Sequence, residues 1–523
     1  MRNSKIVALV ATAALLVLGA AFTSFAATYT WYQVDGIWHC KDKSGDDYTQ
    51  AFAKSGSDIY WLDENGEMAT DLFLEEDGNY YYFDETGKML KNDWHKVEND
   101  DDEGDEYYWY YFQNSGKAIK GKNKPVSVTG KKYLFTDDAK MLYGWTDGNA
   151  FDDADSAWTD AKYYCGDADD GAVRFGWQQA DVIDAAEDLE EQTYWFYFGT
   201  NGIKTAATAT KDPETGKDRN VVEKTINGKK YVFDSRGVMK AEWVAAATTE
   251  SCASASISAY YRFQTVEDGS KIKKGWFRVV PQAQVNATAN EDDEDHWFYA
   301  VGGGEIAKDC VKTIKGKKYG FNSKGEMVSG LWTVDDITAV NGDFDDDANC
   351  IDTEGEVSDL TTSTDEKNVY FFGDEETDGA MKTGTVTTEI DGDDYTFYFG
   401  TTGASKYLAN NGWKKNAYYV NGSKLKADAD YRYQLFEALN TGSDVQKAAF
   451  TALGATGCKL DDIQINPTGI KDVRNRIKSY TTASTVKYVL VSSSGSFVKN
   501  ATVKKDADGF KFTVSNYLVT KVE

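Results

Sequence analysis

Aromatic and polar residues alternate along most of the chain, in a phrase that returns several times. In Ile226–Trp243, written INGKKYVFDSRGVMKAEW, Tyr231 and Phe233 lie on one face of an extended segment and Lys230 lies on the other. The turn residues of Asp234–Gly237 follow at once. The pattern therefore predicts a β-hairpin of about 20 residues with one aromatic face.

The same phrase occurs at Val128–Trp145 and Ile314–Trp332, and looser copies fill most of residues 57–427. One hairpin is too small to bury its aromatic face, whereas a stack of hairpins can do so. We therefore expect a mostly β fold, a solenoid of stacked hairpins over residues 57–427. The strict copies return at long intervals, which indicates blocks of two or three hairpins.

The N-terminus has the pattern of an export signal. Arg2 and Lys5 precede an apolar run from Ile6 to Phe22, and small residues follow. This pattern predicts a signal peptide over residues 1–26, cleaved between Ala26 and Ala27. An uncleaved anchor helix is the alternative, although the run is short for a membrane span. Residues 27–56 are then interpreted as an N-terminal cap segment.

The pattern changes after residue 427. Tyr431, Leu435, Phe436 and Leu439 have the spacing of one helical face, which predicts a helical segment over residues 428–486. From residue 487 onward, alternating residues and turn glycines predict a C-terminal β segment, 487–523. A solenoid needs an atypical end that covers its last edge, so this segment is interpreted as a cap. A separate module that binds a protein partner is the alternative.

Composition narrows the class of partner. The 523 residues include 85 Asp and Glu against 57 Lys and Arg, for a net charge of −28. Such an acidic chain repels phosphate backbones, so we do not expect nucleic acid to be a partner. We also expect no cofactor.

Metal ligands and cysteines give only weak signals. Asp343, Asp345, Asp347 and Glu354 have the offsets of a calcium-binding loop, but Ala348 stands where that loop needs glycine. They are therefore a weak calcium candidate. The cysteines are widely separated, and outside the cell they could pair or remain as small buried residues. There are six of them: Cys40, Cys165, Cys252, Cys310, Cys350 and Cys458.

The repeated pattern G-K-K-Y-x-F-(D/N)-x-x-G-x-M-x-x-x-W resembles the cell-wall-binding repeats of Gram-positive surface proteins. This superfamily includes choline-binding repeats, glucan-binding repeats and the C-terminal repeats of large clostridial toxins. The resemblance implies a secreted or cell-wall-associated protein that binds teichoic acid, glycan or other carbohydrate in aromatic pockets between hairpins. The candidate binding residues are the aromatics at matching positions: Tyr80, Tyr82, Trp94, Tyr133, Trp145, Trp177, Tyr231, Trp243, Trp276, Tyr319, Trp332 and Trp413.

One departure from the choline-binding pattern concerns the ligand. Lys132, Lys230 and Lys318 stand where that pattern has the first aromatic residue of a strand. A lysine there would remove one wall of a choline cage and repel a cation. We therefore expect these repeats to bind sugar rings rather than choline. Tyr and Phe residues at alternate positions can equally be the solenoid's core.

Three functions are compatible with this pattern. The first is a non-catalytic surface protein that binds wall polymer or carbohydrate. The second is a structural stalk or adhesin whose C-terminal segment contacts a partner. The third, an accessory part of a wall hydrolase, is disfavoured because the chain has no HExxH or GxSxG motif and no matched Cys/His pair.

Overall fold

The computed structural model describes a large part of the chain. The described residues are 29–99, 104–185, 187, 190–208, 210–211, 218–219, 221–245, 255–362, 367–374, 378–415, 417–427, 432–439, 486–505 and 511–523. The predicted signal peptide and its cleavage site, Ala26 and Ala27, lie outside these residues. Two compact units are formed, one by residues 1–242, 247–250 and 265–270, the other by residues 243–246, 251–264 and 271–523.

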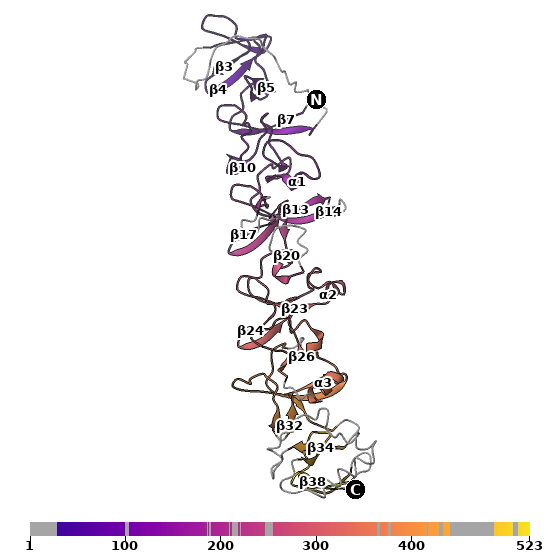
Figure 1. The fold of residues 1–523 in the computed structure, drawn as a ribbon. Coiled ribbons are helices and arrows are strands. Elements are labelled where there is room, and N and C mark those ends of the chain that lie inside the picture. The colour runs from indigo at the N-terminus through magenta and orange to yellow at the C-terminus, as the bar shows by residue number, and fades with distance from the viewer. Residues whose placement is uncertain are drawn as a thin grey trace. The chain divides into compact units, whose positions relative to one another are not determined.

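The first unit consists of antiparallel hairpins that follow one another in chain order (Figure 1). Its elements are β1 Thr30–Val34, β2 Ile37–Lys41, β3 Ala51–Ser55, β4 Asp58–Leu62, β5 Leu72–Glu76, β6 Asn79–Phe83, β7 Asp93–Glu98, β8 Tyr107–Phe112, β9 Val126–Val128, β10 Lys131–Tyr133, β11 Gly144–Thr146, α1 Ala157–Asp160, β12 Tyr163–Cys165, β13 Gly176–Asp184, β14 Glu190–Phe198, β15 Thr210–Lys211, β16 Asp218–Arg219, β17 Val221–Ile226, β18 Lys229–Asp234 and β19 Met239–Lys240.

The second unit begins with the same kind of hairpin and ends in two larger sheets. Its elements are β20 Trp243–Ala245, η1 Ile257–Ala259, β21 Tyr260–Arg262, β22 Gly275–Val279, α2 Ala287–Glu291, β23 His296–Ala300, β24 Cys310–Ile314, β25 Lys317–Phe321, β26 Gly330–Thr333, η2 Asp347–Asn349, β27 Cys350–Ile351, α3 Glu354–Thr362, β28 Val369–Phe372, β29 Gly384–Ile390, β30 Asp393–Phe399, β31 Gly412–Lys414, β32 Ala417–Val420, β33 Ser423–Lys424, β34 Tyr433–Leu439, β35 Val486–Ser492, β36 Ala501–Lys505, β37 Lys511–Ser515 and β38 Leu518–Val522.

The predicted hairpins are present, and their turns explain the repeated asparagine and glycine. Between β17 and β18, Asn227 and Gly228 have φ values of 49° and 80°. A two-residue turn with positive φ at both positions matches the twist of the paired strands. The mostly β prediction is therefore confirmed. Hairpins also begin earlier than predicted, because β1 and β2 lie inside the supposed cap, residues 27–56.

At five junctions a hairpin contacts the next through a methionine and a glycine. The Met141 side chain, which follows β10, lies against Gly171, so a Cβ at Gly171 would be 2.4 Å from the Met141 Sδ. The pairs Met68–Gly87, Met89–Gly116, Met239–Gly269 and Met327–Gly379 repeat this contact. The glycine of these turns is thus needed for the close approach of the methionine, and at four of the five it also has a positive φ.

At one junction, alanines replace both the methionine and the turn glycine of this contact. Ala118 stands in the place of the methionine, and Ala139 stands in the place of the next turn glycine, with a φ of 64°. Both side chains are buried in the same cluster. The smaller Ala118 leaves room for a Cβ at residue 139, so the exception follows the same steric rule.

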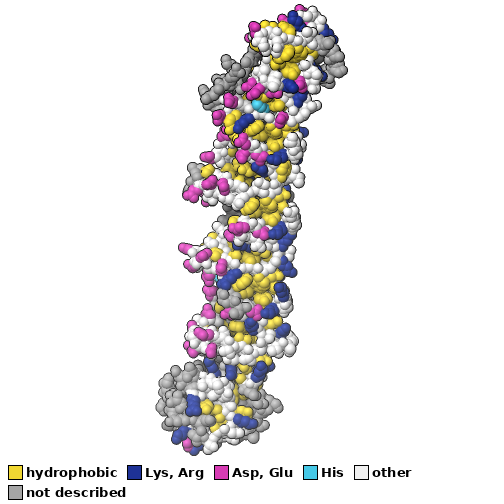
Figure 2. All heavy atoms as spheres, turned by 180° about the vertical axis from the view of Figure 1, so that it is seen from behind, with side chains coloured by type: hydrophobic (Ala, Val, Ile, Leu, Met, Phe, Trp, Pro, Cys, Tyr) yellow, Lys and Arg dark blue, Asp and Glu magenta, His cyan; other side chains and the backbone are white. Residues whose placement is uncertain are grey.

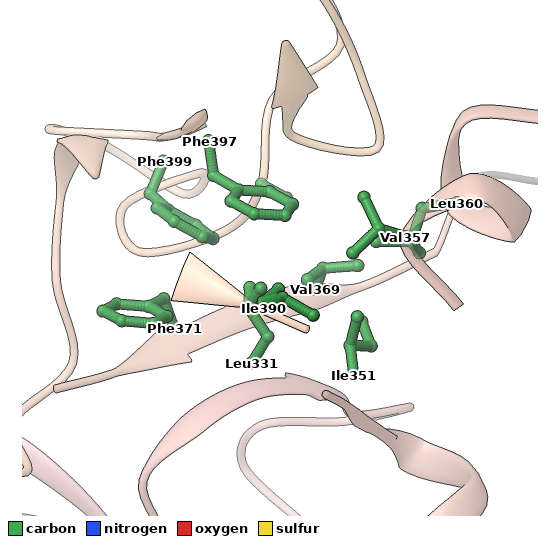
Figure 3. Close-up of a cluster of buried hydrophobic side chains, with 10 residues drawn as sticks. Leu331, Ile351, Val357, Leu360, Val369, Phe371, Ile390, Phe397 and Phe399 are labelled. Atoms are coloured by element: carbon green, nitrogen blue, oxygen red, sulfur yellow. The ribbon is translucent and has the colours of Figure 1, made fainter. Parts of the chain in front are cut away.

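The loops between hairpins add short helices. Val357 and Leu360, three residues apart on α3, point into a cluster with Ile351 and Val369 (Figure 3). Leu360 is 1% exposed and Val357 2%. This cluster covers one face of β26–β28 and β29–β30 with aliphatic side chains instead of a further hairpin. Within the described residues, no helix is long and apolar enough to cross a membrane.

The predicted helix at the start of the C-terminal region is wrong. Tyr433–Leu439 forms strand β34, paired antiparallel with β35 over its whole length. Leu435 and Phe436 are both buried, one in each of two neighbouring clusters, so the two sides of the strand are covered. An apolar run covered on both sides lacks strict alternation and can match a helical spacing. The rest of the predicted helical segment, residues 440–485, lies outside the described residues.

We expect Gly171→Ala to lower the free energy of unfolding more than Gly130→Ala. Both glycines have positive φ, which costs an alanine about 1–2 kcal/mol. A Cβ at Gly130 meets nothing within 4 Å, whereas at Gly171 it meets Met141. This overlap should add about 1–3 kcal/mol. Urea unfolding measures both values, and equal losses would contradict the proposed methionine–glycine contact.

Candidate functional site

An aromatic cage lies where the β13–β14 hairpin meets the β17–β18 hairpin. Trp177 and Trp195 come from the first hairpin, with ring centroids 6.3 Å apart and planes at 87°. Tyr231 comes from the second, 4.8 Å from Trp177 at 67°. Met239 joins them in lining a cavity of ≈ 440 Å³. Both tryptophans are half-buried, so each leaves part of its ring facing the cavity.

The second unit builds the same cage from different residues. Trp276 and Trp297, on β22 and β23, are 6.2 Å apart at 88°, and Tyr319 lies 4.8 Å from Trp276 at 68°. Met327 belongs to the same cluster. These values agree with those of the Trp177 cage within 0.1 Å and 1°. The geometry is therefore a property of the repeat.

Two further cages have the same components. The Trp94 cage consists of Trp94, Trp109, Tyr133 and Met141, with Trp94 4.8 Å from Tyr133 at 63°. The Trp31 cage consists of Trp31, Trp38, Tyr60 and Met68, which line a cavity of ≈ 250 Å³. Trp31 lies 5.2 Å from Tyr60 at 68°.

Strand register places the two tryptophans of each cage on one side of their hairpin. Trp177 pairs with Tyr197 and Gln179 pairs with Trp195, so the two tryptophans are diagonal neighbours. Diagonal side chains on one face are within reach of each other when they are aromatic. The same diagonal relation holds for Trp276 with Trp297, Trp94 with Trp109 and Trp31 with Trp38.

A backbone hydrogen bond fixes the methionine of three cages. The Met327 N–H donates to the Trp297 carbonyl at 2.8 Å. Met141 and Met68 donate in the same way to Trp109 and Trp38, again at 2.8 Å. The second hairpin is thereby held in register with the first, and its methionine and tyrosine close the cage that the two tryptophans open.

Charged groups at the rim come from the second hairpin of a cage and from the turn of a third. Lys229 forms an ion pair with Asp268 at 2.9 Å, and both line the Trp177 cavity together with Glu267. Lys131–Asp170 and Lys317–Asp378 repeat the pair at the Trp94 and Trp276 cages, each at 3.0 Å. Near the Trp31 cage the pair is Asp58–Lys88, with the charges exchanged. Figure 2 shows acidic and basic side chains beside hydrophobic surface in each unit.

Rim carboxylates are held ionised by their neighbours. The Trp109 indole N–H donates to Asp169 at 3.1 Å, and Lys96 lies 3.4 Å away, so the pKa of Asp169 is lowered. A hydrogen bond from Ser270 and then Lys229 lower the pKa of Asp268. Each of these two cages thus has a carboxylate beside it that is negative at neutral pH. An aromatic enclosure with a nearby negative charge suits a cation of low hydration.

The lysines expected to remove a cage wall do not do so. The wall at that position comes from the preceding hairpin, as Trp109, Trp195 or Trp297. Lys230 instead forms an ion pair with Glu223 on the neighbouring strand. The expectation that these lysines disfavour a choline-type cage is therefore wrong, because the walls of one cage come from two successive hairpins and not from one copy of the repeat.

Half of the predicted binding residues lie in cages. Trp94 with Tyr133, Trp177 with Tyr231, and Trp276 with Tyr319 are brought together as described. Tyr80 and Tyr82 pack instead on Phe73 and His95. Trp413 packs on Tyr418 and Phe497. Trp145, Trp243 and Trp332 each contact side chains of their own unit.

The sequence prediction omitted the second tryptophan of every cage. Trp109, Trp195 and Trp297 occur in the loose copies DEYYWYYF, TYWFYF and HWFYA, which lack the strict phrase. Trp31 and Trp38 lie before residue 57, the predicted start of the repeats, whereas Tyr60 lies inside the first repeat but is not among the predicted binding residues. The available signal was the diagonal spacing of two tryptophans across one hairpin, which is readable only once the strands are paired correctly.

The structure does not bring the predicted calcium ligands together. Among the described residues, no group of three His, Cys, Asp or Glu side chains is placed to hold a metal ion. Asp343 and Asp345 accept hydrogen bonds from the Asp335 and Ser323 backbone instead. Cys40, Cys165, Cys310 and Cys350 are free thiols in the structure. Cys252 and Cys458 lie outside the described residues.

Comparison with known proteins agrees with this class of repeat. The choline-binding repeat family model matches residues 51–94, which span β3 to the start of β7. The chain thus resembles the cell-wall-binding repeat proteins, as the sequence pattern indicated. No curated protein matches the chain.

Three solved structures from Streptococcus pneumoniae are similar. The autolysin LytC matches with 14% identity and a TM-score of 0.32, covering 58% of this chain and 54% of LytC. The choline-binding domain of CbpL matches with 23% identity and a TM-score of 0.25, covering 41% and 88%. Choline-binding protein F matches with 17% identity and a TM-score of 0.24, covering 72% and 98%. This chain therefore spans about half the length of LytC.

We expect Trp109→Phe to raise the pKa of Asp169 toward its ordinary value. The substitution keeps an aromatic ring but removes the indole N–H, which is the largest cause of the lowered pKa. Carboxyl NMR of labelled aspartate measures the change. Trp195→Phe is the matched control, since it removes an indole from another cage. An unchanged pKa of Asp169 in Trp109→Phe would contradict this assignment.

Proposed function

We propose that this chain is a non-catalytic, exported surface protein that attaches to cell-wall polymer by holding quaternary ammonium groups, such as choline, in its aromatic cages. The observation that carries the proposal is the near-identical geometry of the Trp177 and Trp276 cages. Rings that only filled a core would be covered on both faces, whereas the Trp177 cage lines a cavity of ≈ 440 Å³.

The shape of the cage favours an alkylated ammonium over a sugar. Its two tryptophan planes are close to perpendicular, so they surround a point rather than form a flat platform. Electron-rich ring faces attract a cation from several sides, and the methionine thioether adds polarisable contact without a hydrogen-bond donor. At the rim, Asp268 is paired with Lys229, and Glu267 adds a further negative charge. A sugar ring needs a flat face and donors for its hydroxyls.

We further propose that the hairpins of each unit stack as a β-solenoid. Support comes from the methionine–glycine contact that recurs from hairpin to hairpin, and from the cages themselves, which need two successive hairpins and a rim from the third. Such a stack would present cages at intervals along a polymer that carries many ammonium groups. Several weak sites then act together and raise the overall affinity.

The export and non-catalytic parts of the proposal rest on the sequence. The apolar run Ile6–Phe22 after Arg2 and Lys5 has the pattern of a signal peptide. Residues 57–427 are repeats, and the sequence lacks hydrolase motifs. The match to a choline-binding repeat over residues 51–94 supports attachment to the wall. Teichoic acid bearing choline is the polymer that fits these features.

We expect Trp195→Leu to weaken binding of free choline at one site by about tenfold or more. One aromatic wall in a desolvated cage contributes about 1–2 kcal/mol, which corresponds to that factor. Isothermal titration with choline measures the loss. Phe175→Leu is the matched control, because Phe175 is an exposed aromatic residue that lines neither described cavity.

Sedimentation with purified walls tests the biological ligand. The combined variant Trp38→Leu/Trp109→Leu/Trp195→Leu/Trp297→Leu, which changes all four cages, should stay in solution, and choline should release the wild-type chain. Release by sugars but not by choline would refute the quaternary ammonium proposal. Far-ultraviolet and aromatic circular dichroism would show that the variant remains folded.

A further inference from the structure

Not every tryptophan at a hairpin junction opens a cage. Trp145 and Trp243 begin the middle hairpin of their blocks, β11–β12 and β20–β21, and each lies against the hairpin that follows. Trp145 contacts Phe196 at 5.0 Å, and Trp243 contacts Phe298 at 5.3 Å.

Neither junction has the full set of cage rings. Lys162 and Tyr260 stand where the cages have their second tryptophan. Phe196 and Phe298 stand where the cages have tyrosine. A further difference is the charged group that meets the indole ring.

At the Trp145 junction that group is a lysine in the position of the cage methionine. The Lys204 N–H donates to the Lys162 carbonyl at 2.7 Å, as the methionines donate to the cage tryptophans. A Cβ at Gly237 would be 2.8 Å from the Lys204 Cδ, which repeats the methionine–glycine contact. The backbone position is therefore unchanged, and an ammonium group has replaced the thioether.

The Lys204 ammonium is enclosed and has its own ligands. Its Nζ lies 5.5 Å from the centroid of the Trp145 ring. It donates to the carbonyl oxygens of Trp158 and, at 3.1 Å, Thr159, which belong to α1. Helix carbonyls of this kind carry partial negative charge and favour a cation. The residue is 7% exposed, so this cation is almost completely removed from water.

A second junction also places a cation on its tryptophan, but from the same hairpin instead of the following one. The Arg262 guanidinium lies 5.5 Å from the centroid of the Trp243 ring, and Arg262 is 8% exposed. The two residues are direct cross-strand partners. Trp243 also donates its indole N–H to the Val280 carbonyl at 2.9 Å. Two independent positions in the chain thus place an internal cation on the tryptophan of the middle hairpin.

We propose that Lys204 and Arg262 are internal occupants that close the Trp145 and Trp243 junctions to an external ammonium ligand. This proposal rests on the proposed function, because it states which junctions bind. Among the described residues, the open cages are then those of Trp31, Trp94, Trp177 and Trp276. The spacing of binding cages is set by the residue that follows each turn, methionine at an open cage and lysine at the closed Trp145 junction.

Burial of Lys204 has a consequence that needs no ligand. Desolvation lowers the pKa of Lys204 to about 8, although Asp234 of β18 and Asp160 of α1 favour its charged form. Arg236 and Lys240 also face Asp234, and Arg236 pairs with Asp184. Because the folded pKa is below the unfolded value of 10.5, folding releases a proton between these pH values. Lys204 therefore favours the folded chain increasingly as the pH rises from about 8.

The first test counts ligand sites on the full chain. Equilibrium dialysis with labelled choline should give the same number of sites for wild type, Trp145→Leu and Trp243→Leu, and one site fewer for Trp177→Leu. A loss of one site in Trp145→Leu or Trp243→Leu would overturn the proposal. If no choline binds to the wild type, the proposed function fails, and the second test judges Lys204 separately.

The second test compares Lys204→Met with Lys162→Met, an exposed lysine of the same junction. Methionine fits the Lys204 position because it occupies that position at four cages. Urea unfolding should show the stability of wild type rising relative to Lys204→Met as the pH is raised from 8 to 10.5. Lys162→Met should show no such change. Parallel pH profiles for wild type and Lys204→Met would overturn the internal occupancy of this junction.

Discussion

Each two-stranded hairpin has an aromatic face that it cannot bury alone, and the rest of the structure depends on the next hairpin covering it. The covering hairpin is held by a methionine that contacts the glycine of the following turn. At three cages the backbone N–H of this methionine also donates a hydrogen bond to the preceding hairpin. The exchange of both partners at Ala118 and Ala139 shows that the contact is steric. A repeat that must be covered by its neighbour has no independent core. The length of the array and its function therefore both depend on several repeats together.

The cages form because each hairpin must be covered by the next one. Where the covering hairpin brings methionine and tyrosine onto two diagonal tryptophans, ring faces remain open and a cavity forms, as at Trp177. Where it brings Lys204, the chain supplies its own cation. At Trp332 the edge of Phe344 meets the indole ring instead. A junction can thus be open or closed according to the side chains that its hairpins supply, while the hairpins follow one another in the same way.

Much of the fold could be predicted from the sequence because its signals are local. Alternation of Tyr231 with Lys230 and the Asn227-Gly228 turn are sufficient to predict a hairpin. The strand at Tyr433–Leu439 could not be predicted in this way, since both of its sides are covered by other strands and its apolar residues lose the alternate pattern. The candidate site was predicted in part: Trp177, Tyr231 and their equivalents were identified, but Trp195 and its equivalents were not.

The sequence by itself determined the hairpins, the aromatic face and the resemblance to wall-binding repeats, because strand period and turn residues act over a few positions. Only the tertiary structure decided which rings share a cage. A cage takes its tryptophans from one hairpin, its tyrosine and methionine from the next and the carboxylates of its rim from a third. The effect of Lys230 on a cage could therefore not be predicted from its own copy of the repeat. Its place in space depends on cross-strand register and on the hairpin before it, which no single copy of the phrase contains.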